Sequence, residues 1–297
     1  SRVTPLDKLA YIGQRGIGAL VYEPIRSPFR EKPFALDMRE VIESSRIAFN
    51  SDLAKMGGSD ALRSIIRVGS SAGGAQAKAV VGWNRDANEF LVGDQALPSK
   101  YEHWLLKITP KEYPNRGKKE FEIYQRAISA GITMSQSEIY ELDGISHFIT
   151  KRFDREKDKR HHIISFSALA HLPMITAPEN RSYEQLFACA KELGLGYSSI
   201  EQLFRRMAFN VLIGEFDDHT KNFSFMLKEG EAWELAPAYD LTGSSFDFND
   251  PWNATSGSHQ LSINGKFSNI TKDDMLKLAD RVGVGNAAEI LNDIKNS

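Results

Sequence analysis

Three polar residues in the second half of the chain have types and spacing suited to phosphoryl transfer. Asp217 is followed five residues later by Asn222, and Asp240 comes shortly afterwards. Phosphoryl transfer needs one carboxylate to orient the attacking hydroxyl, and an amide and a second carboxylate to hold Mg²⁺. The order Asp, Asn, Asp is the order in which protein kinases carry these groups, although the spacing here is tighter and the second Asp is not in a DFG. The pattern therefore favours a divergent kinase with Asp217 as its catalytic carboxylate.

The neighbours of these residues have predicted roles as well. Asp218 points away from its neighbour Asp217, so we expect it to fix the loop. His219 is expected to brace the loop by hydrogen bonding, and Lys221 is a candidate contact for the γ-phosphate, with an exposed lysine as the alternative. The alternative for the whole segment is a polar turn between a helix and a strand, and for Asp240 it is a cap of the turn that follows.

A glycine-containing segment at residues 69–78 lies between two predicted strands, 62–68 and 79–81. Glycines let backbone amides approach a phosphate closely. A P-loop is disfavoured because Ala75 and Gln76 stand where Lys and Ser or Thr belong, and because a strand rather than a helix follows. We predict a phosphate-binding loop between strands, with an ordinary hairpin loop as the alternative.

A kinase also needs a lysine for the nucleotide phosphates and a carboxylate on a nearby helix that pairs with this lysine. Lys107 lies on a predicted strand after the glycine segment, and Lys78 is a rival that lies closer to that segment. Glu120 and Glu122 compete for the carboxylate. Helical periodicity places Glu120 beside the buried stripe and Glu122 on the solvent face, so position favours Glu120.

The elements that must position these residues change in character along the chain. The first half is rich in predicted strands, and the second half is mainly helical. We predict an α+β, bilobal, protein-kinase-like fold, with an N-terminal lobe over residues 1–155 and a helical C-terminal lobe over residues 156–297. Helices are predicted at 39–55, 118–130 and 182–193. A further helix is predicted to begin with a capping box at 198–201 and to bury residues up to Val211 and Leu212. Strands are predicted at 103–108 and 148–153, and a lobe-connecting loop at 154–162.

Composition fits a globular protein and narrows its partners. The chain has 297 residues, of which 41% are hydrophobic and 26% charged, and its formal net charge is −2. Such a charge provides no basic field for nucleic acid. Cys189 is the only cysteine, so an internal disulfide and a zinc site built on cysteines are excluded. With no apolar run long enough to span a bilayer, we expect a cytoplasmic protein without a membrane partner.

Together, these motifs resemble the HipA family of bacterial toxin kinases. The resemblance covers most of the chain, in the right order. The matching stretches are 71–78 for the glycine loop, 151–155 for the segment where the lobes join and adenine binds, 217–223 for the catalytic segment, 235–241 for the metal segment, and 262–266.

The resemblance implies an ATP- and Mg²⁺-dependent Ser/Thr protein kinase of a toxin–antitoxin pair. Its implied partner is a small helix-turn-helix antitoxin resembling HipB, which contacts operator DNA, and its implied substrate is a translation component such as an aminoacyl-tRNA synthetase. Autophosphorylation at Ser71, or at the neighbouring Ser70, would silence the kinase. The implied catalytic base is Asp217, the Mg²⁺ ligands are Asn222 and Asp240, and the nucleotide contacts are Ser71, Ala72, Gly73, Gly74, Lys78, Lys107, Arg152, Phe153 and Lys221.

One departure concerns the start of the chain. The resemblance implies a further small N-terminal subdomain before residues 4–10, which this sequence lacks, so we expect either a trimmed chain or a split system with a second polypeptide. Two other functions stay open: a small-molecule kinase of similar fold, and a kinase-like binding module of an antitoxin–DNA complex.

Overall fold

A computed structural model describes residues 4–14, 16–25, 35–49, 76–93, 96–172, 181–243 and 257–297. The chain divides into two compact units: unit 1 comprises Ser1–Lys118 and Gln136–His162, and unit 2 comprises Lys119–Ser135 and Ile163–Ser297. The strand predicted at 62–68 and the glycine loop, with Ser70, Ser71, Ala72, Gly73 and Gly74, lie outside the described residues.

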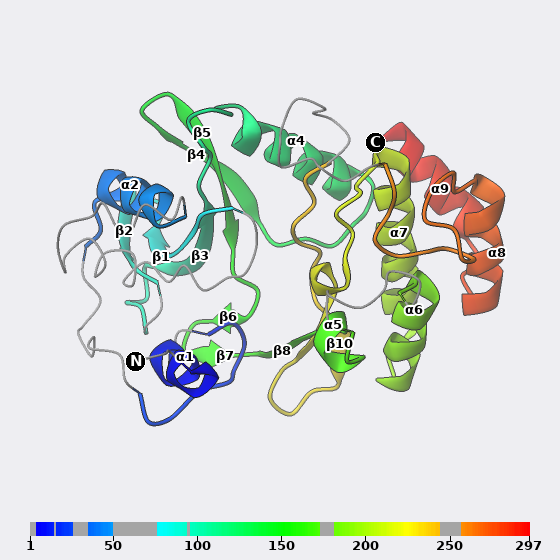
Figure 1. The fold of residues 1–297 in the computed structure, drawn as a ribbon, viewed down its shortest axis with the longest axis horizontal. Coiled ribbons are helices and arrows are strands. Elements are labelled where there is room, and N and C mark those ends of the chain that lie inside the picture. The colour runs from blue at the N-terminus through cyan, green and yellow to red at the C-terminus, as the bar shows by residue number, and fades with distance from the viewer. Residues whose placement is uncertain are drawn as a thin grey trace. The chain divides into compact units, whose positions relative to one another are not determined.

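Unit 1 is built on an antiparallel sheet of five strands in the order β2-β1-β3-β5-β4 (Figure 1). The helix α2 (Met38–Phe49) contributes Met38, Val41 and Ile42 to a core that includes Trp104 of the central strand. These apolar residues recur at helical spacing, which explains why this helix covers the sheet. The strands are β1 (Lys78–Asn84), β2 (Glu89–Val92), β3 (Glu102–Lys107), β4 (Ser137–Leu142) and β5 (Ile145–Lys151).

Two parts of unit 1 differ from the sequence prediction. The helix α1 (Pro5–Ile12) was not predicted, although Thr4 and Asp7 form its capping box. The stretch 154–162 was predicted as a lobe-connecting loop, but it contains the small hairpin of β6 (Arg155–Glu156) and β7 (Lys159–Arg160). The loop prediction was wrong because it treated the alternating charges as solvated, whereas Asp154 is buried.

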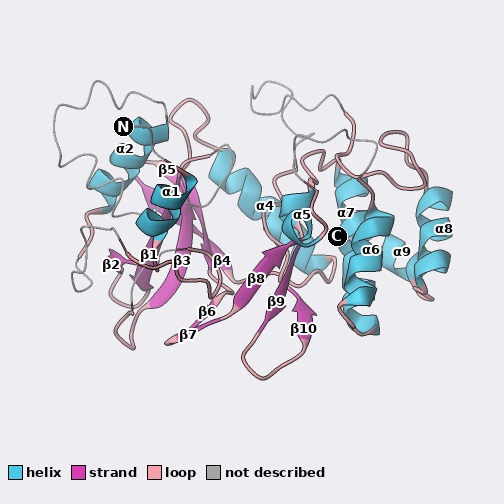
Figure 2. Ribbon diagram, turned by 60° about the horizontal axis from the view of Figure 1, so that its bottom comes forward, coloured by secondary structure: helices cyan, strands magenta, loops and turns pink. Residues whose placement is uncertain are grey.

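Unit 2 is mainly helical and contains a three-stranded sheet in the order β10-β9-β8 (Figure 2). The strands are β8 (His162–Ser165), β9 (Ser224–Leu227) and β10 (Trp233–Leu235), and the helices are α4 (Arg116–Ser129), α5 (Phe166–Leu169), α6 (Tyr183–Glu192), α7 (Tyr197–Ile213), α8 (Lys272–Val282) and α9 (Ala287–Asn296). No helix within the described ranges is long and apolar enough to cross a bilayer.

The helix α7 carries the chain to the predicted catalytic segment. It begins earlier than predicted, with Gly196 as an N-cap that has no side-chain bond, so the predicted capping box at 198–201 was wrong. The prediction that Leu212 is buried was also wrong, because Ile213 packs inward instead and Leu212 is 46% exposed. Gly214 ends the helix in the left-handed conformation, at a φ of 65°.

Candidate active site

The predicted catalytic segment forms a tight turn between α7 and β9. Residues 215–219 belong to no regular helix or strand, and the 3₁₀ helix η3 (Thr220–Asn222) follows them. The Nδ2 atom of Asn222 donates a hydrogen bond of 2.8 Å to the backbone oxygen of Asp217. The side chain of Asp217 is 56% exposed, so its carboxylate is accessible to a substrate.

Asp240 belongs to a second segment that is fastened to this turn. The hydroxyl of the preceding Tyr239 donates to the backbone oxygen of Lys221 at 2.6 Å and lies 2.5 Å from Oγ of Ser224. Asp240 itself adopts a left-handed φ of 58°, a rare conformation for a residue with a side chain. Such a conformation persists only where the surrounding structure holds it in place.

Burial and neighbouring charges act on the pKa of Asp217. Desolvation raises the pKa of Asp217, and the charges of Glu215 and Asp240 raise it further, while His219 acts in the opposite direction. The Nε2 atom of His219 lies 3.9 Å from Oδ1 of Asp217, which is too far for a hydrogen bond.

The donor set fits Mg²⁺. Because Nδ2 of Asn222 is used by the Asp217 backbone, its amide oxygen is the atom that remains for a cation. One carboxylate and one amide oxygen suit Mg²⁺, which keeps several waters and substrate phosphates as further ligands. Groups of three or more His, Cys, Asp or Glu side chains with metal-binding geometry are absent from the described part of the chain.

Asp218 fixes the loop through hydrogen bonds to buried partners, as predicted. It is buried, and its Oδ2 accepts the hydroxyl of Tyr183 at 2.6 Å and lies 3.0 Å from Nδ1 of His259. Its Oδ1 accepts the backbone N–H of Gln260 at 2.7 Å. With both oxygens bonded inside the protein, Asp218 is a structural carboxylate, and its neighbour Asp217 is the accessible one.

Glu215 is a residue of this site that the sequence reasoning missed. It lies directly after the Gly214 cap, is 1% exposed, and accepts the backbone N–H of Asp217 and that of Thr242. The only sequence signal was an acidic residue next to a helix-ending glycine, and this signal says nothing of partners 27 residues away.

In unit 1, the two candidate phosphate-binding lysines lie opposite each other. Lys78 of β1 pairs in register with Lys107 of β3, and both are buried. Residues directly opposite in an antiparallel pair project from the same face, so both ammonium groups lie on one side of the sheet. The Nζ atom of Lys107 lies 5.6 Å from the ring centroid of Phe148. In unit 2, Glu120 is buried and Glu122 is exposed, as their helical positions predicted.

Arg152 has a partner within unit 1. Its Nε and one terminal nitrogen donate to Asp154 at 2.9 and 2.7 Å, and Arg155 donates to the same carboxylate at 2.7 Å. The backbone N–H of Gly18 completes the set at 2.7 Å, so a residue near the start of the described chain also holds this carboxylate. The Arg152 guanidinium thus anchors this segment, and the adjacent Phe153 is half-buried.

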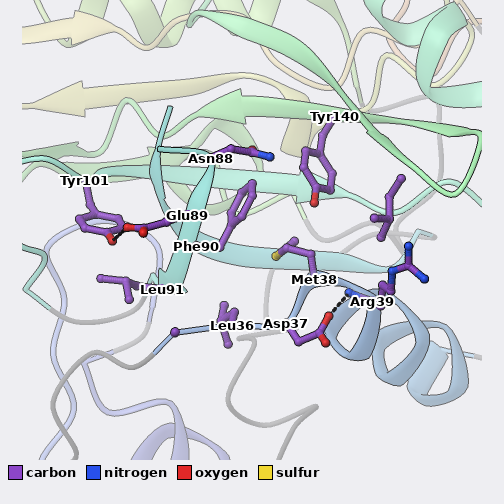
Figure 3. Close-up of a pocket in the computed structure, with 12 residues that line it drawn as sticks. Leu36, Asp37, Met38, Arg39, Asn88, Glu89, Phe90, Leu91, Tyr101 and Tyr140 are labelled. Atoms are coloured by element: carbon purple, nitrogen blue, oxygen red, sulfur yellow. Dashed lines mark hydrogen bonds between the residues drawn. The ribbon is translucent and has the colours of Figure 1, made fainter. Parts of the chain in front are cut away.

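A separate open pocket of about 470 Å³ in unit 1 contains none of the predicted site residues (Figure 3). Phe90 and Tyr140 meet edge to face at its centre, with ring centroids 5.1 Å apart. Two of its polar residues are paired with each other, since the hydroxyl of Tyr101 donates to Glu89 at 2.7 Å. The pocket is therefore not a candidate for the catalytic site.

Known proteins are similar to part of the sequence of this chain, and a solved structure is similar to its fold. "Putative kinase Y4dM" of Sinorhizobium fredii is 26% identical over 152 residues, which are 46% of this chain and 36% of that protein. A "Putative kinase" of Haemophilus influenzae is 25% identical over 156 residues, 48% of this chain and 46% of that protein. The matches thus span less than half of either relative.

A solved structure from Shewanella oneidensis MR-1, a toxin–antitoxin system HipA, HipB and operator DNA complex, matches with a TM-score of 0.72 and 18% identity. The match covers 99% of this chain and 70% of that chain. At this identity the likeness concerns the fold, and it confirms the predicted bilobal, kinase-like α+β class. Residues 70–297 match the HipA-like C-terminal domain, so the chain belongs to the HipA-like C-terminal domain family.

Proposed function

We propose that this chain is an ATP- and Mg²⁺-dependent Ser/Thr protein kinase. The observation that carries the proposal is the convergence of the Asp217–Asn222 turn with the segment that bears Asp240, through the Tyr239 hydroxyl and the Asn222 amide. Two relatives named as putative kinases support the same chemistry.

In this proposal, Asp217 accepts a hydrogen bond from the acceptor hydroxyl and orients it toward the γ-phosphate. An exposed carboxylate with a raised pKa is suited to receive a proton late in the transfer. Asn222 and Asp240 hold Mg²⁺, which neutralises charge on the phosphates when bound. Lys221 is exposed and contacts the γ-phosphate in this proposal.

Unit 1 supplies the phosphate-binding groups. The buried pair Lys78 and Lys107 concentrates positive charge at the start of β1, which immediately follows the glycine segment. Lysine ammonium groups bind phosphates as point charges. We assign both lysines, together with residues 71–74, to the nucleotide phosphates, and residues 152–153 to the adenine end. Glu120 is the proposed partner of Lys107.

For the biological role, we propose a toxin of a HipA/HipB-like toxin–antitoxin system. The Shewanella oneidensis complex contains HipA, HipB and operator DNA, so the proposed partner is a helix-turn-helix antitoxin. The proposed substrate is a translation component such as an aminoacyl-tRNA synthetase, and autophosphorylation of Ser71 or Ser70 provides self-silencing.

A screen of acceptors with γ-labelled ATP and Mg²⁺ tests the reaction class. It compares protein acceptors with small molecules, and uses Asp217→Asn as the control. Label on protein that disappears in the folded Asp217→Asn variant supports the proposal. Label confined to small molecules would show a metabolite kinase, and retained transfer by the variant would remove Asp217 from its role.

A further inference from the structure

The carboxylate of Glu215 joins the two segments that carry the proposed chemistry. Its Oε1 accepts the backbone N–H of Asp217 at 3.0 Å. Its Oε2 accepts the N–H groups of Thr242 and Gly243, each at 2.7 Å, and the hydroxyl of Thr242 at 3.2 Å. One side chain thus bonds the catalytic turn with one oxygen and the metal segment with the other.

The chain is held by hydrogen bonds on both sides of Asp240. Before Asp240, the hydroxyl of Tyr239 donates to the backbone oxygen of Lys221. After Asp240, the N–H groups of Thr242 and Gly243 donate to Glu215. The left-handed φ of Asp240 lies between these two attachments. A rare backbone conformation with an attachment on each side is held at a defined place relative to Asp217.

Burying the carboxylate of Glu215 costs desolvation free energy. The residue is 1% exposed and accepts only backbone and hydroxyl donors, so its charge is desolvated and held by neutral dipoles. Hydrogen bonds to a charged group are about twice as strong as neutral ones. A neutral side chain would be the simpler choice for packing alone.

We propose that Glu215 is a positioning residue, whose buried carboxylate sets the separation of the catalytic Asp217 from the metal-binding Asp240. This inference rests on the proposed kinase function. Removal of a residue that hydrogen-bonds to a metal ligand, and so orients it, typically lowers metal affinity by 10- to 100-fold. A displacement of about 1 Å at the reacting groups lowers the rate by about 100-fold.

The test variant is Glu215→Gln, which keeps the shape of the side chain. A glutamine has one accepting oxygen and one NH₂ group, so it cannot accept from both segments, and one of them is released. Glu184→Gln is the control, because Oε1 of Glu184 also accepts a backbone N–H in the same unit, that of Asn264 at 2.8 Å, and in addition pairs with Arg281.

Two quantities are measured in wild type and both variants. One is Mn²⁺ binding with a non-hydrolysable ATP analogue, followed by water-proton relaxation; the other is the rate of phosphate transfer from ATP. We expect Glu215→Gln to weaken Mn²⁺ binding about tenfold and to lower kcat about 100-fold, with the KM for ATP changed less than kcat. Glu184→Gln should leave both quantities within about twofold of wild type.

The outcomes separate this inference from the proposed function. A folded Glu215→Gln variant with wild-type Mn²⁺ affinity and rate would overturn the positioning role. Weakened Mn²⁺ binding beside a wild type that transfers no phosphate would support positioning and contradict the kinase function. If the variant fails to fold, hydrogen exchange of wild type decides: the amides of Asp217, Thr242 and Gly243 must be protected, and rapid exchange would refute the bonds.

Discussion

At the residue scale, the structure uses buried carboxylates to hold backbone segments and leaves one carboxylate accessible. Asp218 and Glu215 accept donors inside unit 2, whereas Asp217 between them is exposed. In unit 1, Asp154 plays a similar part for the backbone at Gly18, whose N–H it accepts. Each of these three buried carboxylates is bonded to at least one group that is distant in the sequence.

Asp154 should make the stability of unit 1 depend on pH. Burial alone would raise its pKa, but the hydrogen bonds and charge of Arg152, together with Arg155, lower it to about 2. Because the folded pKa lies below the unfolded value of 3.8, the carboxylate stabilises the fold above pH ~4 and loses this effect as the pH falls toward 2. The contribution at neutral pH is about 2 kcal/mol.

The measurement is urea unfolding of wild type and Asp154→Asn between pH 7 and pH 2.5. We expect the variant to be about 3 kcal/mol less stable at pH 7, since it leaves buried arginines without their carboxylate, and the gap to narrow below pH 4. Asp158→Asn, on the exposed turn of the same hairpin, is the control and should change stability by less than about 0.5 kcal/mol. A gap that is absent at pH 7, or independent of pH, would contradict this account.

At the element scale, the end of α7 determines where the proposed catalytic turn begins. Gly214 takes a left-handed conformation that turns the chain sharply into Glu215 and Asp217. The end of α8 is built in the same way, with Gly283 at a φ of 85°, but it carries none of the proposed site residues. The two glycines therefore form a matched pair for testing this geometry.

Alanine at either glycine should cost about 1 kcal/mol in the free energy of unfolding, because a side chain disfavours the left-handed conformation. Only Gly214→Ala should also lower the rate of phosphate transfer, by about tenfold or more, because it shifts the turn that carries Asp217. Thermal unfolding and label transfer on both variants check this. Equal transfer rates in the two variants, at equal loss of stability, would show that the α7 cap does not position the turn.

Helical periodicity predicted several of the helices because this signal is local. The helices predicted at 118–130, at 182–193 and from 198 onward are observed at 116–129, 183–192 and 197–213. The failures were also local: Leu212 could not be assigned to a face without knowing that Ile213 packs inward. Residues 198–201 match the sequence pattern of a capping box, but the helix begins before them, with Gly196 as its N-cap.

At the scale of the whole molecule, each unit carries one part of the proposed machinery. Unit 1 holds the cations Lys78 and Lys107, and unit 2 holds Asp217, Asn222 and Asp240. The order of these residue types along the chain was enough to predict the class of fold, and the chemistry that it indicates stays a proposal. It could not predict the contacts that fix them, such as Glu215 with Thr242, since these depend on folded geometry.

The most direct test of the central claim is phosphate transfer to the protein itself. Dephosphorylated wild type and Asp217→Asn are incubated with γ-labelled ATP and Mg²⁺, and the labelled residues are identified by mass spectrometry. The account predicts label on Ser71 or Ser70 in wild type and none in the variant. A folded wild type that gains no label, or an Asp217→Asn variant labelled as strongly as wild type, would contradict the claim that Asp217 is the catalytic base of a kinase.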